Sequence, residues 1–417
     1  MSAVSNIEQR HQKLRNNSNF VIYLIGLSFS NLGSSITTFV FPLMILELTN
    51  SAFQVALVTA LTVIPYALLG LPAGAIIDKL NRKKIMQIAD IARFLGYLTI
   101  PIAHFLGYLS IYQIYVVALI SGIALVFHSI SEVSSLPSIV EKEHLSAANS
   151  YIYASQNLTS VLGPTIGGTL YALFSYPSLI AFDSITFLIS FFSLILIKND
   201  FTINNISKEK SKISFGVIKE DIVIGLKYLF SDSKIKVMAI IITWTNLLVA
   251  PYYIYTVIFA KDSLQTTPEL LGMLFGFSSL GALAGSLLTT KLSNKFGFGK
   301  LIIILILVDT VARLLLPFSP NIYWMIPVMA FTYGAQAIIN IAIITLRQTT
   351  VPSELLGRVN SVFRTMVFAS RPIGLFIGGV IIEKFGGFTA LLSVGILCIP
   401  IFLYALSSKL YTLDKEN

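Results

Sequence analysis

Twelve apolar stretches, each long enough to cross a lipid bilayer, make up most of this 417-residue chain. A helix needs about 20 apolar residues to cross roughly 30 Å of hydrocarbon. Only 12% of the residues are charged and 55% are hydrophobic, a balance that excludes an ordinary soluble domain. We therefore expect an all-α membrane protein with twelve transmembrane helices. The expected spans are 20–47, 52–77, 84–107, 111–135, 145–175, 178–198, 235–260, 268–290, 299–318, 321–346, 355–383 and 387–408.

One long polar segment separates the first six stretches from the last six. Its first part is linker-like, and its second part places Phe215, Ile222 and Leu229 on one helical face. Such a face is typical of an interfacial helix lying on the membrane surface. The predicted divisions are a first half at 1–198, a cytoplasmic linker at 199–234 and a second half at 235–417.

The basic residues gather in the loops on one side of the expected helices. Of the 29 lysines and arginines, 23 fall on the side of the amino terminus, and only Lys261 and Lys384 fall in the opposite loops. Cytoplasmic loops carry this excess, so both termini are expected in the cytoplasm. The net charge of +9 is spread between the apolar stretches, which argues against a nucleic-acid partner.

Sequence motifs of enzymes and metal proteins are absent. The chain contains no HExxH or GxSxG sequence, and FGFGK at 296–300 lacks the first glycine and the Ser/Thr of a phosphate-binding loop. The single cysteine, Cys398, lies inside an apolar stretch. We therefore expect no enzymatic activity, no metal and no cofactor.

Glycines recur between the two halves at a constant offset of 211 residues. Gly70 and Gly74 correspond to Gly281 and Gly285 at this offset. A constant offset near half the chain length indicates two repeated halves in the same orientation. The same offset relates Gly163, Gly167 and Gly168 to Gly374, Gly378 and Gly379.

A short basic turn joins the second and third spans. It reads G-x-x-x-D-x-x-x-R-K-K, with Gly74, Asp78, Arg82 and Lys83, and Gly70 lies one turn earlier. Glycines four residues apart let a neighbouring backbone approach closely. The pattern resembles the cytoplasmic loop motif of the major facilitator superfamily, and this resemblance implies two parallel six-helix halves.

The fifth span carries LGPTIGG at 162–168. This sequence resembles the Gly-Pro motif of the superfamily's proton-driven exporters, and the combined pattern is closest to macrolide-efflux proteins, with siderophore exporters nearby. Proline removes one helical hydrogen bond and glycines permit close packing, so this helix can bend while it seals a cavity. The resemblance implies that Asp78 acts in the cytoplasmic gate. The expected gate and conformational residues are Gly70, Gly74, Asp78, Arg82, Lys83, Gly163, Pro164, Gly167, Gly168 and Arg358.

His128 and Glu132 lie one turn apart in the fourth span, which lines the central cavity in the resembling family. Imidazole titrates near neutral pH, and a carboxylate beside it can take and release a proton in each cycle. We expect this pair to couple transport to protons. The alternative is a hydrogen bond between helices.

Two other pairs of opposite charge lie inside spans, Asp90 with Arg93 and Asp309 with Arg313. Spacings of three and four residues put both partners on one helix face, where they can neutralise each other. We expect these pairs to be structural.

By the same resemblance, the first, seventh and tenth spans complete the cavity, and Arg371 of the eleventh span is a further candidate. Mixed aromatic and amide walls suit a bulky amphipathic ligand. Arg371 lies near mid-membrane and needs an anion, either a carboxylate such as Glu132 or Asp309, or a substrate anion. The cavity candidates are Asn31, Thr38, Trp244, Asn246, Tyr252, Tyr255, Tyr333, Gln336, Asn340 and Arg371.

The expected function is proton-coupled export of a small amphipathic compound, a drug or secondary metabolite, by a monomer in the bacterial plasma membrane. Three alternatives stay open. They are export of an anionic metabolite such as a carboxylate siderophore, import of a nutrient, and a membrane sensor that does not transport.

Overall fold

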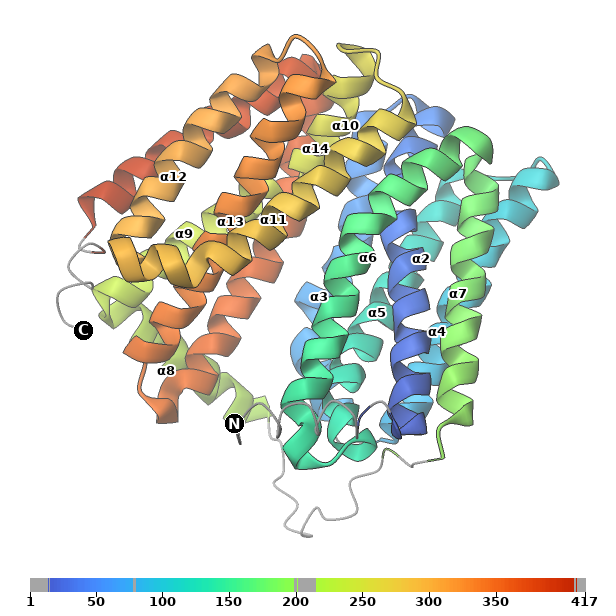
Figure 1. The fold of residues 1–417 in the computed structure, drawn as a ribbon, viewed down its shortest axis with the longest axis horizontal. Helices are drawn as coiled ribbons and strands as arrows, with labels where there is room; N and C mark the ends of the chain where they lie inside the picture. The colour runs from blue at the N-terminus through green and yellow to red at the C-terminus, as the bar shows by residue number, and fades with distance from the viewer. Residues whose placement is uncertain are drawn as a thin grey trace. The chain divides into compact units, whose positions relative to one another are not determined.

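The computed structural model describes residues 14, 16–77, 80–198, 201, 215–408 and 410, and every regular element in these residues is a helix. The chain divides into two compact units. Unit 1 comprises Met1–Met44 and Ile64–Ser211, and unit 2 comprises Ile45–Val63 and Lys212–Asn417. In Figure 1, unit 1 accounts for most of the blue-to-green part of the chain, and unit 2 contains the blue segment Ile45–Val63 and the yellow-to-red part.

Unit 1 is a helical bundle in which α4 packs against both α5 and α7. A buried apolar cluster that includes Phe20, Leu136 and Leu194 joins α2, α5 and α7. The helices are α2 (Ser18–Thr49), α3 (Ala52–Ile77), α4 (Arg82–Phe105), α5 (Ile111–Ile139), a 3-10 turn (Lys142–His144), α6 (Leu145–Leu173) and α7 (Tyr176–Leu196), with the end of α2 and the start of α3 assigned to unit 2.

The first turn of α4 ties three helices together. Asn81 caps this helix by accepting a hydrogen bond from the Lys84 backbone N–H. Arg82 Nη1 donates to the Ser134 carbonyl oxygen near the end of α5 over 2.6 Å, and Lys83 Nζ donates to the Ile197 carbonyl oxygen after α7 over 2.7 Å. Cations at the carboxyl ends of helices complement the helix dipole. These basic residues therefore hold the ends of α5 and α7 against the start of α4.

Unit 2 packs α11 against α13 and α14 against α9. The 3-10 turn Leu316–Phe318 follows α12. The helices are α8 (Phe215–Ser231), α9 (Ser233–Val249), α10 (Tyr252–Asp262), α11 (Pro268–Phe296), α12 (Phe298–Leu315), α13 (Ile322–Thr350) and α14 (Ser353–Ser407).

A carboxylate of α14 caps the first turn of α3 within unit 2. Glu383 accepts one hydrogen bond from the Phe53 backbone N–H and one from the Ser51 hydroxyl, each at 3.0 Å. An acidic group at a helix amino terminus satisfies an unpaired N–H and complements the helix dipole. The rings of Phe53 and Phe376 pack edge-on beside this cap at 5.7 Å.

Ten helical segments in the described part of the chain are long and apolar enough to cross a membrane. The last of these, Leu355–Ser407, covers the two final expected spans and leaves helical geometry at Gly386, where φ is 74°. Helix α6 is not among the ten because Ser, Thr, Asn and Gly lower its hydropathy, although it has the length expected for the fifth span. The all-α membrane fold is confirmed, and the number twelve depends on α6 being a span.

The segment that separates the two halves in the sequence is described only in part. Residues 199–200 and 202–214 lie outside the described residues. The expected helix after them is α8, which packs against α14. A Cβ atom at Gly225 would lie 2.8 Å from the Arg358 carbonyl oxygen, so this position requires glycine for the close approach.

The glycines of the repeated motifs have unequal surroundings. A Cβ atom at Gly163 would overlap Ser35 of α2, and one at Gly374 would overlap the Leu247 backbone of α9. By contrast, a Cβ atom at Gly74 would meet no atom within 4 Å in the described structure. Close packing is thus supported for the glycine of α6 and not for the second glycine of the basic-turn motif.

This contrast predicts unequal effects of two Gly→Ala substitutions. Gly163→Ala should lower stability by about 1–3 kcal/mol because it overpacks the contact between α6 and α2. Gly74→Ala should leave stability unchanged or raise it slightly by restricting the unfolded chain. Thermal unfolding of the two variants in detergent tests the prediction, and equal midpoints would contradict it.

Candidate functional site

Three titratable side chains form a row inside unit 1. The His128 imidazole has its Nε2 atom 3.4 Å from Asp90 Oδ1 on α4 and its Nδ1 atom 3.9 Å from Glu132 Oε2 on its own helix, α5. Side-chain exposure falls from 13% at Glu132 to 5% at His128 and 0% at Asp90. The row therefore leads from a partly accessible carboxylate to one enclosed by protein.

Two neighbouring helices hold the outer end of this row. Gln156 Nε2 on α6 donates to Glu132 Oε1 over 3.4 Å, and the Tyr23 hydroxyl on α2 donates to the Glu132 carbonyl oxygen over 3.5 Å. The amide thus orients one carboxylate oxygen while the other faces His128. A carboxylate beside an imidazole is suited to taking up and releasing a proton.

Asp90 and Arg93 do not form the expected ion pair in the part of α4 that the structure describes. Arg93 Nη2 instead donates to Ser34 Oγ on α2 over 2.9 Å, and its guanidinium lies 3.8 Å from the centroid of Phe187 on α7. The long arginine side chain reaches away from its own helix while the short aspartate side chain meets His128 on α5. The row thus gains Asp90, which we had expected to be neutralised by its own helix.

Asp309 and Arg313 form the expected ion pair within α12. Arg313 Nε donates to Asp309 Oδ2 over 2.8 Å, and the two side chains are 2% and 6% exposed. The guanidinium also lies over the Tyr252 ring of α10, 4.4 Å from its centroid. This pair is a buried structural contact, as expected.

A pocket of about 220 Å³ lies in unit 2 between α9, α13 and α14. Two arginines line it, Arg347 of α13 and Arg364 of α14, together with the amides of Asn246 and Asn340. The remaining lining side chains are apolar or aromatic: Ile242, Ile343, Ile344, Phe363, Val367 and Phe368. A pocket with apolar walls and a few fixed polar groups is typical of a ligand site.

Two of the expected cavity residues, Asn246 and Asn340, line this pocket. One turn before Asn340, the Gln336 Oε1 atom is buried without a hydrogen-bond partner among the described residues. Arg371 is exposed on α14, two turns after Arg364. Its suggested pairing with Asp309 is not formed, because Oδ2 of that aspartate binds Arg313.

Three of the other cavity candidates, Trp244, Tyr252 and Tyr255, make packing contacts. Trp244 Nε1 donates to the Leu397 carbonyl oxygen over 3.0 Å, and Tyr252 lies under Arg313. Tyr255 is buried beside Gly378, and Tyr333 is half-buried on α13. On α2, Asn31 is half-buried, whereas Thr38 is exposed and donates to the Ser34 carbonyl oxygen over 2.7 Å.

The comparison with known protein families decides which class this helical chain represents. Residues 12–417 match the major facilitator family described as transmembrane secretion effector. The chain belongs to the major facilitator superfamily. It is therefore a multi-pass membrane transporter of small molecules and not an enzyme.

Among its major facilitator relatives are two named efflux proteins. The multidrug efflux pump Tap of Mycolicibacterium fortuitum is 25% identical over 376 residues, which cover 88% of this chain and 90% of that protein. Macrolide efflux protein A of Streptococcus pyogenes is 23% identical over 382 residues, which cover 89% and 91% of the two chains.

Solved structures of the same fold have lower sequence identity. The nucleoside transporter NupG superposes with a TM-score of 0.77 at 12% identity and covers 94% of this chain and 100% of that one. A bacterial homologue of the iron transporter ferroportin, facing inward, has a TM-score of 0.68 at 17% identity, with coverages of 92% and 98%. These likenesses support the major facilitator fold.

The expected gate residues of this major facilitator protein differ in the contacts that the structure shows for them. Arg82 and Lys83 hold helix ends, as described above, and Asp78 lies outside the described residues. Gly163 packs against α2, whereas a Cβ atom at Gly70 would meet, among the described residues, only Tyr66 of its own helix, at 3.4 Å. Pro164 and Arg358 are half-buried, and Gly167 and Gly168 are buried.

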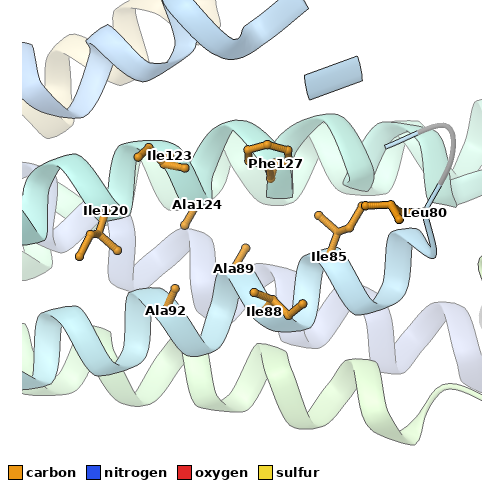
Figure 2. A pocket seen from close by; sticks show the side chains of 9 residues that line it. All are labelled: Leu80, Ile85, Ile88, Ala89, Ala92, Ile120, Ile123, Ala124 and Phe127. Atoms are coloured by element: carbon orange, nitrogen blue, oxygen red, sulfur yellow. The ribbon is translucent and has the colours of Figure 1, made fainter. Parts of the chain in front are cut away.

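A second cavity lies in unit 1, between α4 and α5, and has a volume of about 410 Å³. Figure 2 shows that all its labelled side chains are aliphatic or aromatic, among them Ile88, Ile120 and Phe127. Ile88 is 69% exposed, so this cavity is an open groove on an apolar face. None of its described lining side chains is polar, so the unit 2 pocket is the better of these two candidates for substrate.

Two buried or pocket-lining charged residues, Asp183 of unit 1 and Arg347 of unit 2, were not predicted from the sequence. Asp183 is fully buried on α7, where Thr186 Oγ1 donates to its Oδ1 over 3.1 Å. A lone acidic residue within the sixth apolar stretch was the available signal. Arg347 was counted with the cytoplasmic loops because it lies near the end of a stretch, yet α13 continues to Thr350 and carries this side chain into the pocket.

Proposed function

We propose that this protein is a proton-coupled exporter of small amphipathic compounds, of the drug or macrolide kind, which works by alternating access. In this proposal it acts as a monomer in the plasma membrane with both termini in the cytoplasm. The efflux function of the named relatives supports the direction of transport. The excess of basic residues in alternate loops supports the orientation.

The observation that carries the proposal is the row of Glu132, His128 and Asp90. Ionisable groups inside a membrane protein are costly and mark ion pathways by default. Glu132 is the accessible member, so it exchanges the proton, and His128 is its partner. Arg93 of α4 and Asp183 of α7 are two further buried charged groups of unit 1, and Gln156 fixes the orientation of the Glu132 carboxylate.

The substrate in this proposal contacts the pocket of unit 2. Asn246 and Asn340 supply hydrogen bonds, and the isoleucine and phenylalanine walls receive its apolar part. Gln336 lies one turn from Asn340 on the same face of α13, and Arg371 lies two turns from Arg364 on the same face of α14. Three other cavity candidates, Trp244, Tyr252 and Tyr255, have a packing role in the contacts described above.

Movement between inward and outward states is assigned to α6 and to the basic turn before α4. Gly163 already lies against α2, and Pro164 removes a backbone hydrogen bond one residue later. Asp78, by its resemblance to the superfamily motif, acts as the gate carboxylate, and Arg358 is a further gate residue. These gate roles are part of the proposal.

Transport by the purified protein in proteoliposomes tests the proposed function. With the cytoplasmic face outward, an acidic lumen should drive accumulation of a radiolabelled macrolide, and a protonophore should abolish it. Accumulation driven only by the opposite pH gradient would indicate proton-coupled import. Absence of flux under both gradients, with the protein folded and inserted, would indicate a membrane protein that does not transport.

A further inference from the structure

We propose that the unit 2 pocket binds an anionic group, such as a carboxylate, sulfonate or phosphate, carried by the amphipathic compound. This inference rests on the proposed export function and deepens it by naming a chemical group of the substrate. The pocket's residues come from α9, α13 and α14, so the site is complete within one unit.

Arg347 supplies the fixed positive charge. Its guanidinium carbon lies 4.3 Å from the centroid of Phe363, a second lining residue. Stacking on an aromatic ring fixes the plane of a guanidinium and leaves its N–H edge for in-plane contacts with an anion. Arg347 Nε is buried and has no hydrogen-bond partner in the described structure, so at least one donor is available.

Charge balance in the pocket favours an anionic occupant. Arg347 and Arg364 both line it, and none of its ten lining residues is an aspartate or glutamate. Guanidinium groups keep their charge in proteins, and charges beside apolar walls are costly unless they are compensated. Arg347 has no carboxylate partner among these ten lining residues, so a ligand anion would compensate its charge.

The amides and the apolar walls define the rest of the ligand. Asn340 lies seven residues before Arg347, on the same face of α13, and can donate an N–H to the same anion. Asn246 Nδ2 already donates to the Ile242 carbonyl oxygen over 2.9 Å, which holds its side chain in place. Ligand pockets usually reach about 300–1,000 Å³. The pocket of about 220 Å³ therefore accommodates one end of an amphipathic molecule rather than all of a large one.

Equilibrium binding of two matched fluorescent probes tests this assignment without any transport. Dansyl acid carries a sulfonate, and dansylamide carries the same ring system with a neutral sulfonamide. The full-length protein in phosphatidylcholine nanodiscs should bind dansyl acid more tightly. Arg347→Gln should weaken binding of dansyl acid by about tenfold and change binding of dansylamide by less than about twofold.

Lys295→Gln is the matched control, because Lys295 is also a cation over a phenylalanine ring but lies outside the pocket. It should leave both affinities unchanged. Arg347→Lys should retain part of the preference for the sulfonate. If Arg347→Gln fails to fold, Arg364→Gln takes its place with the same expected result.

Three results would overturn the proposal. The first is equal affinity of the wild type for both probes, and the second is an equal loss of both probes in Arg347→Gln. The third is displacement of dansyl acid when phosphatidylglycerol replaces part of the lipid, because the anion would then be a lipid headgroup. The assay needs no pH gradient, so its failure is distinguishable from failure of proton-coupled export.

Discussion

Glu132→Gln is expected to abolish accumulation driven by a pH gradient while substrate exchange continues. Glutamine keeps the shape of the side chain and the contact with Gln156 but cannot bind a proton. One pH unit is worth about 1.4 kcal/mol per proton, hence about tenfold accumulation for a one-proton exchange. Uptake by the variant in proteoliposomes should therefore reach only the external concentration under a gradient that drives the wild type.

Two comparisons make this prediction specific to the row. Glu143→Gln removes an exposed carboxylate and should transport as the wild type does. His128→Ala should also lose pH-driven uptake, because the imidazole joins Glu132 to Asp90. If both Glu132→Gln and His128→Ala retain pH-driven uptake, coupling lies at another carboxylate, and Asp183 and Asp309 become the next candidates.

Asp309→Asn is expected to cause the largest loss of stability. The substitution leaves the Arg313 charge buried, with 2% of its side chain exposed and without its ionised partner. Removing one member of a buried ion pair typically costs about 3–5 kcal/mol. The temperature at which half of the protein remains monodisperse in detergent, measured by size-exclusion chromatography after heating, should fall clearly below that of the wild type.

The double variant Asp309→Leu, Arg313→Met separates lost pairing from lost charge. Replacement of both members by apolar side chains leaves no buried charge, so it should cost less than the single substitution. A double variant that is less stable than Asp309→Asn would show that the contact of Arg313 with Tyr252, rather than the ion pair, is the main stabilising interaction.

Much of the architecture could be predicted from local sequence patterns. Apolar stretches set the helix positions, because a chain with long hydrophobic segments must satisfy its backbone hydrogen bonds within each segment. Gly386 was expected to fall between two spans, and the structure has a positive φ there. The apolar pattern was weakest for α6, because the polar and small residues that pack this helix lower its hydropathy.

The candidate sites were predictable only where partners lie on one helix. Asp309 with Arg313, and His128 with Glu132, are one turn apart, so helical spacing alone brought them together. Asp90 meets His128 across two helices, and no spacing rule connects them. The same limit explains why Tyr252 was assigned to the cavity, although Arg313 of another helix covers its ring.

The sequence by itself determined that this protein is helical and membrane-spanning, and its motifs indicated the superfamily, because hydropathy and short motifs are properties of contiguous residues. Only the tertiary structure decided which charges are compensated. Side chains such as Arg93 and Arg347 reach well beyond their own helix turn, so their partners depend on which helix packs beside them. Helix packing thus joined Asp90 to the proton-coupling candidates and Arg347 to the ligand pocket.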